Sequence, residues 1–146
     1  MVTLPHPPRS HCPINFGLEI FGDGWTLLVL RDLLIAGKSR FSEFLASEER
    51  IATNLLTDRL ARLERAGLIT RARDGDDRRK IVYRPTDAAR ALVPVLVEMS
   101  YWGARHDPVT AAPPGFVLAY EADRDGLLRA VAAGLDPRQA GDPTKS

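Results

Sequence analysis

The hydrophobic pattern of this chain changes its period at Gly67, and this change restricts the fold more than any other feature of the sequence. Leucines recur at helical spacing through residues 52–66, which predicts an amphipathic helix that the glycine ends. Residues 68–73 and 80–84 instead carry β-preferring side chains on either side of an Asp-Gly turn, a pattern typical of a β-hairpin. The chain must therefore accommodate a helix that leads directly into a small two-stranded sheet.

Three further helices are predicted ahead of these two elements. Residues 13–21 place a proline at an early helical position, and residues 25–35 are so apolar that their helix should be buried on most sides. Residues 41–46 form a shorter amphipathic segment that Ser39 or Ser42 can cap. A charged loop then leads to the leucine-rich helix.

The chain after the hairpin is also predicted to be helical. A long helix at residues 87–105 can be capped by Thr86 or Asp87, and Pro94 inside it should produce a kink. Residues 116–134 show a weaker helical pattern. The sequence thus predicts a mainly α fold with one small β-hairpin.

We expect three parts along the chain. Residues 1–10 are rich in proline and should form a flexible tail, residues 11–106 hold most of the helices and the hairpin, and residues 107–146 form a C-terminal helical extension and tail. No run approaches the roughly 20 apolar residues that cross a bilayer, so we expect a soluble cytoplasmic protein without membrane contact. The single cysteine, Cys12, fits a reducing compartment.

Basic charge collects in the middle of the chain. Residues 31–90 hold 14 Lys or Arg against 10 Asp or Glu, whereas the remainder holds 6 against 9. A protein that binds nucleic acid needs such a concentration of positive charge. A solvated protein surface produces the same imbalance, so charge alone leaves both interpretations open.

The helix at residues 52–66 has a polar side suited to contact with DNA bases. Small hydrogen-bonding side chains, Thr53, Asn54 and Thr57, lie opposite its leucines near its start. Arg59 and Arg62 follow at positions from which phosphates could be reached. Taken alone, this face favours the simpler interpretation, the solvated side of an ordinary amphipathic helix, because most polar helix faces are only solvated.

The predicted hairpin is strongly basic. Its cations are Arg71, Arg73, Arg78, Arg79 and Lys80. Their mutual repulsion is explained if DNA phosphates neutralise them, although the aspartates of the turn could also pair with them at the surface. A polar helix followed by a basic hairpin is the arrangement of a winged helix, in which the helix enters the major groove and the hairpin lies beside it.

Many short motifs in a characteristic order lie between residues 12 and 103. They are Cys12-Pro13-Ile14, Phe21-Gly22-Asp23, Trp25-Thr26, Arg40-Phe41, Phe44, Ile51, Leu56-Thr57, Arg59-Leu60, Leu63-Glu64, Gly67-Leu68-Ile69, Tyr83, Thr86 and Trp102-Gly103. In these residues the chain resembles HxlR-type transcriptional regulators. The chain departs from the pattern at Gly24, where a basic residue is usual, at Ala52, where a capping serine is common, at Pro85, where an apolar residue is usual, and at Ala89, where glycine is usual. Pro85 should end the second strand early. Neither Ala52 nor Pro85 removes a charge from the basic surface.

The resemblance implies a winged helix-turn-helix within residues 11–106, with extra N- and C-terminal dimerisation helices. It implies a homodimer that binds an inverted-repeat operator, with the helix at 52–66 in the major groove and the hairpin on the backbone or minor groove. It implies no catalysis and no cofactor. The residues expected to bind DNA are Arg40, Thr53, Asn54, Thr57, Arg59, Arg62, Arg78, Arg79 and Lys80.

Cys12 is a candidate redox sensor, because some relatives of this family use the matching cysteine to sense oxidants. A helix start would favour its thiolate, but a buried or inert thiol is the simpler interpretation, because reactivity requires an exposure that the sequence does not show. The His and Cys spacing predicts no metal site, and no catalytic motif is present. Three hypotheses remain: a DNA-binding regulator, a winged helix that binds protein only, and a regulator that responds to thiol chemistry or to a small-molecule effector.

Overall fold

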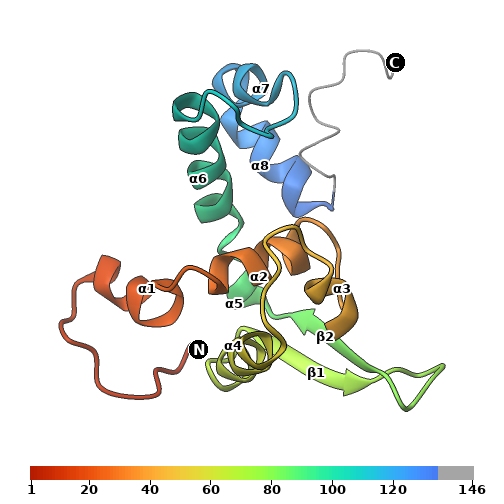
Figure 1. The fold of residues 1–146 in the computed structure, drawn as a ribbon. Helices are drawn as coiled ribbons and strands as arrows, with labels where there is room; N and C mark the ends of the chain where they lie inside the picture. Colours follow the sequence, from red (N-terminus) through yellow and green to blue (C-terminus); the bar gives the residue numbers. More distant parts are fainter. Residues whose placement is uncertain (135–146) are drawn as a thin grey trace. The chain divides into compact units, whose positions relative to one another are not determined.

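The computed structural model describes residues 1–134, and the chain divides into two compact units. The first runs from Met1 to Arg90, and the second begins at Ala91 (Figure 1). The last twelve positions of the expected C-terminal tail, residues 135–146, lie outside the described residues. Within the described part, the structure confirms a mainly α fold with one antiparallel hairpin.

The first unit contains five helices and the hairpin in its described residues. They are α1 (Pro13–Phe21), α2 (Thr26–Leu34), α3 (Phe41–Leu45), α4 (Thr53–Arg65), β1 (Ile69–Arg73), β2 (Ile81–Pro85) and α5 (Asp87–Arg90). The leucine-rich helix ends at Gly67 as predicted, because this glycine takes a positive φ of 82° that other residues rarely adopt. The chain then turns directly into β1, which lies beside α4 (Figure 1).

The core of this unit forms where α2, α3, α4 and the hairpin meet. Its largest fully buried side chains are Leu30, Phe44, Leu56, Leu63 and Leu68. The ring of Phe44 packs edge-on against Tyr83 of β2, with centroids 6.2 Å apart. These contacts bury the leucine stripe of α4 and thereby determine which of its sides faces out.

The two strands of the hairpin pair along their whole length. The register runs from Ile69 opposite Pro85 to Arg73 opposite Ile81. Pro85 was expected to end the second strand early, but it is the last residue of β2 and keeps its place opposite β1. A terminal position tolerates proline because its missing N–H is not needed in the interior of the ladder. On the other side of β2, the amide of Tyr83 donates to the Ser39 carbonyl at 2.7 Å.

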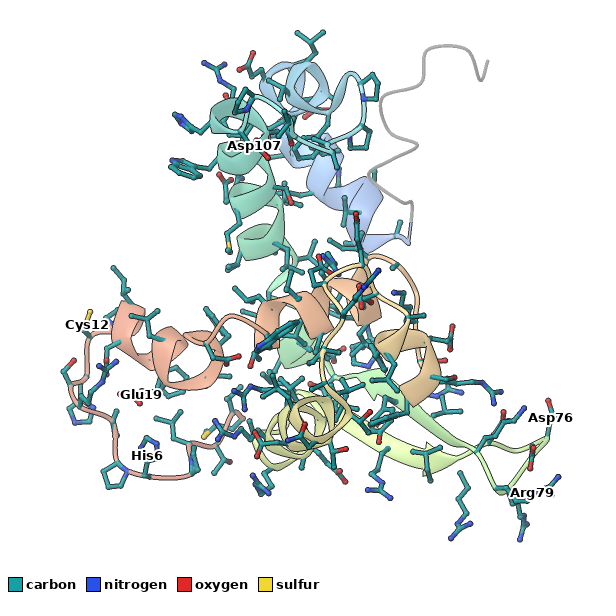
Figure 2. All side chains as sticks on the ribbon, viewed as in Figure 1. His6, Cys12, Glu19, Asp76, Arg79 and Asp107 are labelled. Atoms are coloured by element: carbon teal, nitrogen blue, oxygen red, sulfur yellow. The ribbon has the colours of Figure 1, made fainter. Side chains whose placement is uncertain are left out.

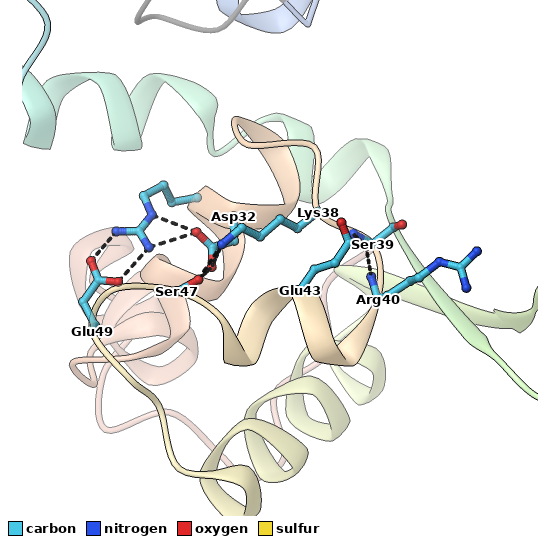
Figure 3. Close-up of polar contacts among 8 residues, drawn as sticks. Asp32, Lys38, Ser39, Arg40, Glu43, Ser47 and Glu49 are labelled. Atoms are coloured by element: carbon cyan, nitrogen blue, oxygen red, sulfur yellow. Dashed lines mark hydrogen bonds and ion pairs between the residues drawn. The ribbon is translucent and has the colours of Figure 1, made fainter.

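A buried carboxylate joins α2 to the loop between α3 and α4 (Figure 3). Asp32 accepts hydrogen bonds from Arg31 at 2.9 and 3.0 Å, from the Lys38 ammonium at 3.4 Å and from the Ser47 hydroxyl. Arg31 also donates to both oxygens of Glu49, at 2.6 and 3.0 Å. This hydrogen bonding lowers the pKa of Glu49 to about 2, against an opposing effect of burial.

The first ten residues contact the rest of the first unit at two places. The amide of Thr3 donates to the Ala66 carbonyl at 3.1 Å, and the Arg9 guanidinium pairs with Glu19 at 2.8 Å. The segment expected as a tail therefore runs along α4 and returns to α1. Glycine at position 67 also leaves room for it, since a Cβ there would lie 3.3 Å from the Met1 carbonyl oxygen.

The predicted long helix at residues 87–105 is wrong in one respect, because it is divided. The short α5 ends at Arg90, and α6 (Val93–His106) starts afresh with Pro94 in its first turn. Proline lacks the N–H that an interior helical position requires, whereas the first turn has no use for that group. The residue predicted to kink a helix therefore begins one instead.

The weaker pattern at residues 116–134 also forms two helices, α7 (Phe116–Ala122) and α8 (Arg124–Ala132). Asp123 separates them, and its carboxylate accepts the Gly126 amide at 2.9 Å as an N-cap for α8. Apolar side chains of α6, α7 and α8 form the core of the second unit. None of the helices described within residues 1–134 is long and apolar enough to span a membrane.

We predict that Asp32→Ala lowers the free energy of unfolding by about 2–3 kcal/mol. The substitution leaves the cations of Arg31 and Lys38 without their buried partner, and their partial exposure limits the cost. Urea unfolding followed by circular dichroism measures the change. Glu48→Ala, an exposed carboxylate in the same loop, should change stability by less than about 0.5 kcal/mol, and equal losses in the two variants would contradict the role of Asp32.

Candidate nucleic-acid interface

The polar face of α4 points to solvent because its leucines point to the core. Leu56, Leu60 and Leu63 are each at most 2% exposed, while Thr53, Asn54 and Thr57 are exposed. The Thr57 hydroxyl donates to the Thr53 carbonyl at 2.9 Å and keeps its oxygen free to accept. The structure thus brings together the three residues predicted to contact bases.

The start of α4 carries no side-chain cap. Ala52 is the N-cap residue, and no side-chain oxygen accepts from the first-turn amides there. Those N–H groups and the positive end of the helix dipole are therefore available to an anion such as a phosphate. Alanine in place of a capping serine leaves this helix start open.

Arg50 lies in the turn before α4 and was missed by sequence reasoning. It is exposed and adopts a positive φ of 58°, which arginine seldom does. Its amide donates to the Ser47 carbonyl at 3.0 Å, which holds the turn in this conformation. No sequence signal identifies it, because arginine has no preference for left-handed turns.

The hairpin tip presents its cations to solvent (Figure 2). The Arg79 side chain is 93% exposed and lies 3.4 Å from Asp77, and the Lys80 ammonium lies 3.9 Å from the same carboxylate. Such exposed pairs are weak, so phosphates can replace them. Arg78 is exposed as well, and its carbonyl accepts from Arg73 at 2.8 Å. Arg84 of β2 adds a further exposed cation that was not predicted.

Arg40 connects the start of α3 to the hairpin. Its guanidinium pairs with Asp74 in the turn of the hairpin, and its Nη1 atom is buried without a hydrogen-bond partner among residues 1–134. The Asp76 amide and Arg40 lower the pKa of Asp74, against an opposing effect of burial. Arg40 therefore positions the hairpin through the contact of its Nη2 atom with Asp74, while 36% of its side chain stays exposed.

Arg59 occupies a different place from the one expected. Its side chain is 13% exposed, its Nε atom pairs with Asp23 at 3.0 Å, and its Nη1 atom pairs with Asp58. This guanidinium is held within the protein, so we replace the expected phosphate contact with a role in anchoring α4 to the start of α2. Arg62, one turn later, is 60% exposed and pairs only with Asp58 at 2.9 Å among the described residues, which keeps it accessible.

The pKa of Asp23 is lowered by this anchor. Burial alone would raise its pKa, but hydrogen bonds from the Thr26 hydroxyl, from the amides of Trp25 and Thr26, and from Arg59 lower it to about 2. Asp23 also serves the first turn of α2, whose amides it accepts at 2.8 and 3.0 Å. One carboxylate thus connects the beginning of α2 with the middle of α4.

Cys12 is exposed and is the N-cap residue of α1 (Figure 2). It lies apart from the predicted base-contacting side chains, which are on a different helix. Among residues 1–134, no three His, Cys, Asp or Glu side chains form a group that could hold a metal ion. The features of Cys12 that bear on its chemistry are therefore its exposure and its position at a helix start.

Comparison with known protein families places these residues in a wider context. Residues 20–110 match the family model described as HxlR-like helix-turn-helix. Two proteins of Bacillus subtilis named as uncharacterized HTH-type transcriptional regulators are similar: YdeP is 37% identical over 95 residues, and YybR is 32% identical over 98 residues. The matches cover 65% and 67% of this chain, and 73% and 78% of the respective relatives.

Solved structures of a putative transcription factor and of a redox regulator are also similar to this chain. The crystal structure of PA1607 matches with a TM-score of 0.64 and 34% identity, covering 70% of this chain and 72% of that one. The oxidized form of the redox regulator HypR matches with a TM-score of 0.60 and 31% identity, covering 67% of this chain and all of that one. Residues 20–110, which match the family, include α4 and the hairpin.

We predict that acid weakens the fold through Asp23. Because its pKa is about 2 in the folded protein against an ordinary value of 3.8, its carboxylate stabilises the fold fully above about pH 4, and the contribution is lost as pH falls through 2. Urea unfolding at several pH values should show a smaller acid-induced loss in Asp23→Asn than in the wild type. Asp87→Asn, which removes a fully exposed carboxylate, is the control and should follow the wild type. If Asp23→Asn showed the same pH dependence as the wild type, Asp23 would not stabilise the fold as proposed.

Proposed function

The chain belongs to the HxlR-like helix-turn-helix family, and from this we propose that it binds operator DNA as a homodimer, with α4 in the major groove and the hairpin on the backbone or minor groove. As a member it is a DNA-binding transcriptional regulator. A regulator works where the genome lies, so we place it in the cytoplasm. We propose no catalytic step and no cofactor for this role.

The observation that supports this docking best is the open start of α4. Thr53, Asn54 and Thr57 present exposed hydrogen-bonding groups, and among residues 1–134 no side chain caps the amides beneath them. Side chains at the start of a recognition helix are the ones that reach base edges. The same turns would meet phosphates through the helix dipole.

The hairpin supports the second half of the docking. Arg78, Arg79 and Lys80 extend from the tip of a two-stranded sheet that Arg40 and the Ser39 carbonyl hold against α3. Cations on such a projection fit a groove lined with phosphates and contribute affinity without sequence preference. Arg50 and Arg62 add accessible cations at either end of α4.

Exposed apolar helices favour the homodimer. α1 buries none of its residues and exposes Ile14, Phe16 and Leu18, and α6 in the second unit exposes Met99 and Trp102. Apolar groups of this size on short helices gain stability when a partner covers them. In a dimer with two-fold symmetry the two α4 helices would enter successive major grooves about 34 Å apart, which calls for an inverted repeat.

Thiol sensing is a second candidate function, favoured by the exposure of Cys12 at a helix start. HypR, 31% identical to this chain, is named a redox regulator. Because this chain contains one cysteine, an internal disulfide is impossible, and oxidation would join two chains or modify the thiol. The signal would act on the proposed dimer through α1.

We predict different effects of two substitutions on DNA binding. Arg79→Ala should weaken binding to all duplexes about equally and reduce the salt dependence by about one ion, because it removes a phosphate contact. Asn54→Ala should relax base preference by about 1–3 kcal/mol. Fluorescence polarisation with an operator selected from random sequences, at two salt concentrations and with random DNA as competitor, measures both, and sedimentation should give two chains per duplex.

The control is Arg129→Ala, which removes an exposed arginine of α8 outside the proposed surface and should leave the salt dependence unchanged. Equal loss of base preference from Arg79→Ala and Asn54→Ala would overturn the division of roles. Binding that never exceeds that of random DNA would instead favour a winged helix that binds protein. One chain per duplex would overturn the dimer.

We predict that diamide changes the operator affinity of the wild type and not of Cys12→Ser. The same polarisation assay, run before and after oxidation and again after reduction with dithiothreitol, measures the change. Non-reducing electrophoresis reports any Cys12-linked dimer. An equal response in both proteins would exclude the thiol as the sensor and leave DNA binding itself untouched.

A further inference from the structure

A cavity of about 590 Å³ lies in the first unit, between the N-terminal segment, α1 and the second half of α4. Leu4, Pro5, Ile20 and Leu63 form apolar parts of its wall. Its volume lies within the range of roughly 300–1,000 Å³ found for small-molecule sites. The cavity is separate from the exposed base-contacting side chains at the start of α4, so DNA binding does not explain it.

Glu19 of α1 gives this cavity a chemical preference. The Glu19 side chain is 9% exposed and points from α1 toward the N-terminal segment that carries His6 (Figure 2). Its Oε1 atom accepts from the Arg9 amide at 3.3 Å, from Arg9 Nε at 2.8 Å and from Asn15 at 3.3 Å. Its Oε2 atom takes part in none of the hydrogen bonds among residues 1–134.

Oε2 is nevertheless not sealed off. Among residues 1–134, the fully buried side-chain polar atom without a hydrogen-bond partner is Arg40 Nη1. Glu19 Oε2 also has no partner there, but it is not fully buried. Glu19 is one of the residues that line the cavity, so its carboxylate is the acidic group in the cavity wall. Hydrogen bonds from Arg9 also lower the pKa of Glu19, so the group is an anion at neutral pH.

We propose that this cavity binds a small primary amine with an apolar body, whose ammonium group donates to Glu19 Oε2. The ammonium would satisfy the unused oxygen of a nearly buried carboxylate, a hydrogen bond between charged groups that is stronger than a neutral one. The apolar body would cover Ile20, Leu63 and the proline-containing segment opposite them. An alcohol of the same shape lacks the positive charge and should therefore bind more weakly than the amine.

Two arginines also line the cavity and oppose this choice, but more weakly. Arg62 is 60% exposed and already pairs with Asp58 at 2.9 Å. Arg65 is exposed, so water and salt screen its charge. Glu19 is the lining charge most withdrawn from solvent. Arg9 offsets part of its charge through Oε1 at 2.8 Å, and Oε2 keeps the capacity to accept a further donor.

Occupancy of the cavity would act on α4 directly. Leu63 and Ala66 belong to the cavity wall, and the Ala66 carbonyl holds the N-terminal segment through the Thr3 amide at 3.1 Å. A ligand that moves this segment changes the support of the helix end opposite the base-contacting turns. This consequence for DNA rests on the proposed function, whereas binding of the amine does not.

The test compares three probes of similar shape in the absence of DNA: benzylammonium, benzyl alcohol and benzoate. Titrations of the full ¹⁵N-labelled chain, followed by two-dimensional NMR, give affinities and identify the amides that shift. We expect benzylammonium to bind the wild type about tenfold tighter than benzyl alcohol, with shifts at Ile20 and Ala66. In Glu19→Gln the two affinities should become about equal. Glu64 is a nearby exposed carboxylate outside the cavity, so Glu64→Gln should keep the preference for the amine.

Several results would overturn the proposal. Equal affinity for the amine and the alcohol would remove the role of Glu19, and tighter binding of benzoate would assign the site to Arg62 and Arg65. Absence of saturable binding by all three probes would mean that the cavity takes no such ligand. The wild-type comparison decides these cases even if Glu19→Gln folds poorly, and DNA binding measured separately keeps the outcome distinct from that of the proposed function.

Discussion

The buried carboxylate of Asp32 is the constraint on which the geometry of the proposed DNA-binding surface depends. A carboxylate removed from water must be matched by donors, and Arg31, Lys38 and Ser47 supply them from the helix itself and from the segments on either side of α3 (Figure 3). Arg31 extends this cluster to Glu49. The loop that leads into α4 is thereby tied to α2, and it presents α4 to the core in which its leucines are buried.

The arginines of the first unit divide into two groups with different work. Arg59 is held by Asp23 and Asp58 and joins helices, and Arg40 braces the hairpin through Asp74. Arg79 at the hairpin tip has a weak surface pair with Asp77 and stays exposed, as its proposed contact with phosphates requires. Residue type is the same in all three, so their roles follow from the partners that the fold brings within reach.

Local pattern was sufficient for much of the fold. α1 has the predicted bounds, α4 and the hairpin strands differ from the predicted ones by a residue or so at each end, and the Leu56, Leu60 and Leu63 stripe is buried as its spacing requires. The C-terminal part was less predictable. Pro94 fits either a kink or a helix start, and Asp123 either a helix interior or a cap, because the choice depends on which apolar side chains find a core.

By itself the sequence determined the kind of molecule: the helical and strand periods, the basic hairpin and the threonine- and asparagine-bearing face of α4 are properties of neighbouring residues. Tertiary structure alone decided which charges are free. It paired Arg59 with Asp23 and Asp58, attached the N-terminal segment to α4 and made Glu19 part of a cavity wall. The reason is physical: a charge is paired or available according to partners that lie far away in the chain, and no local pattern records those distances.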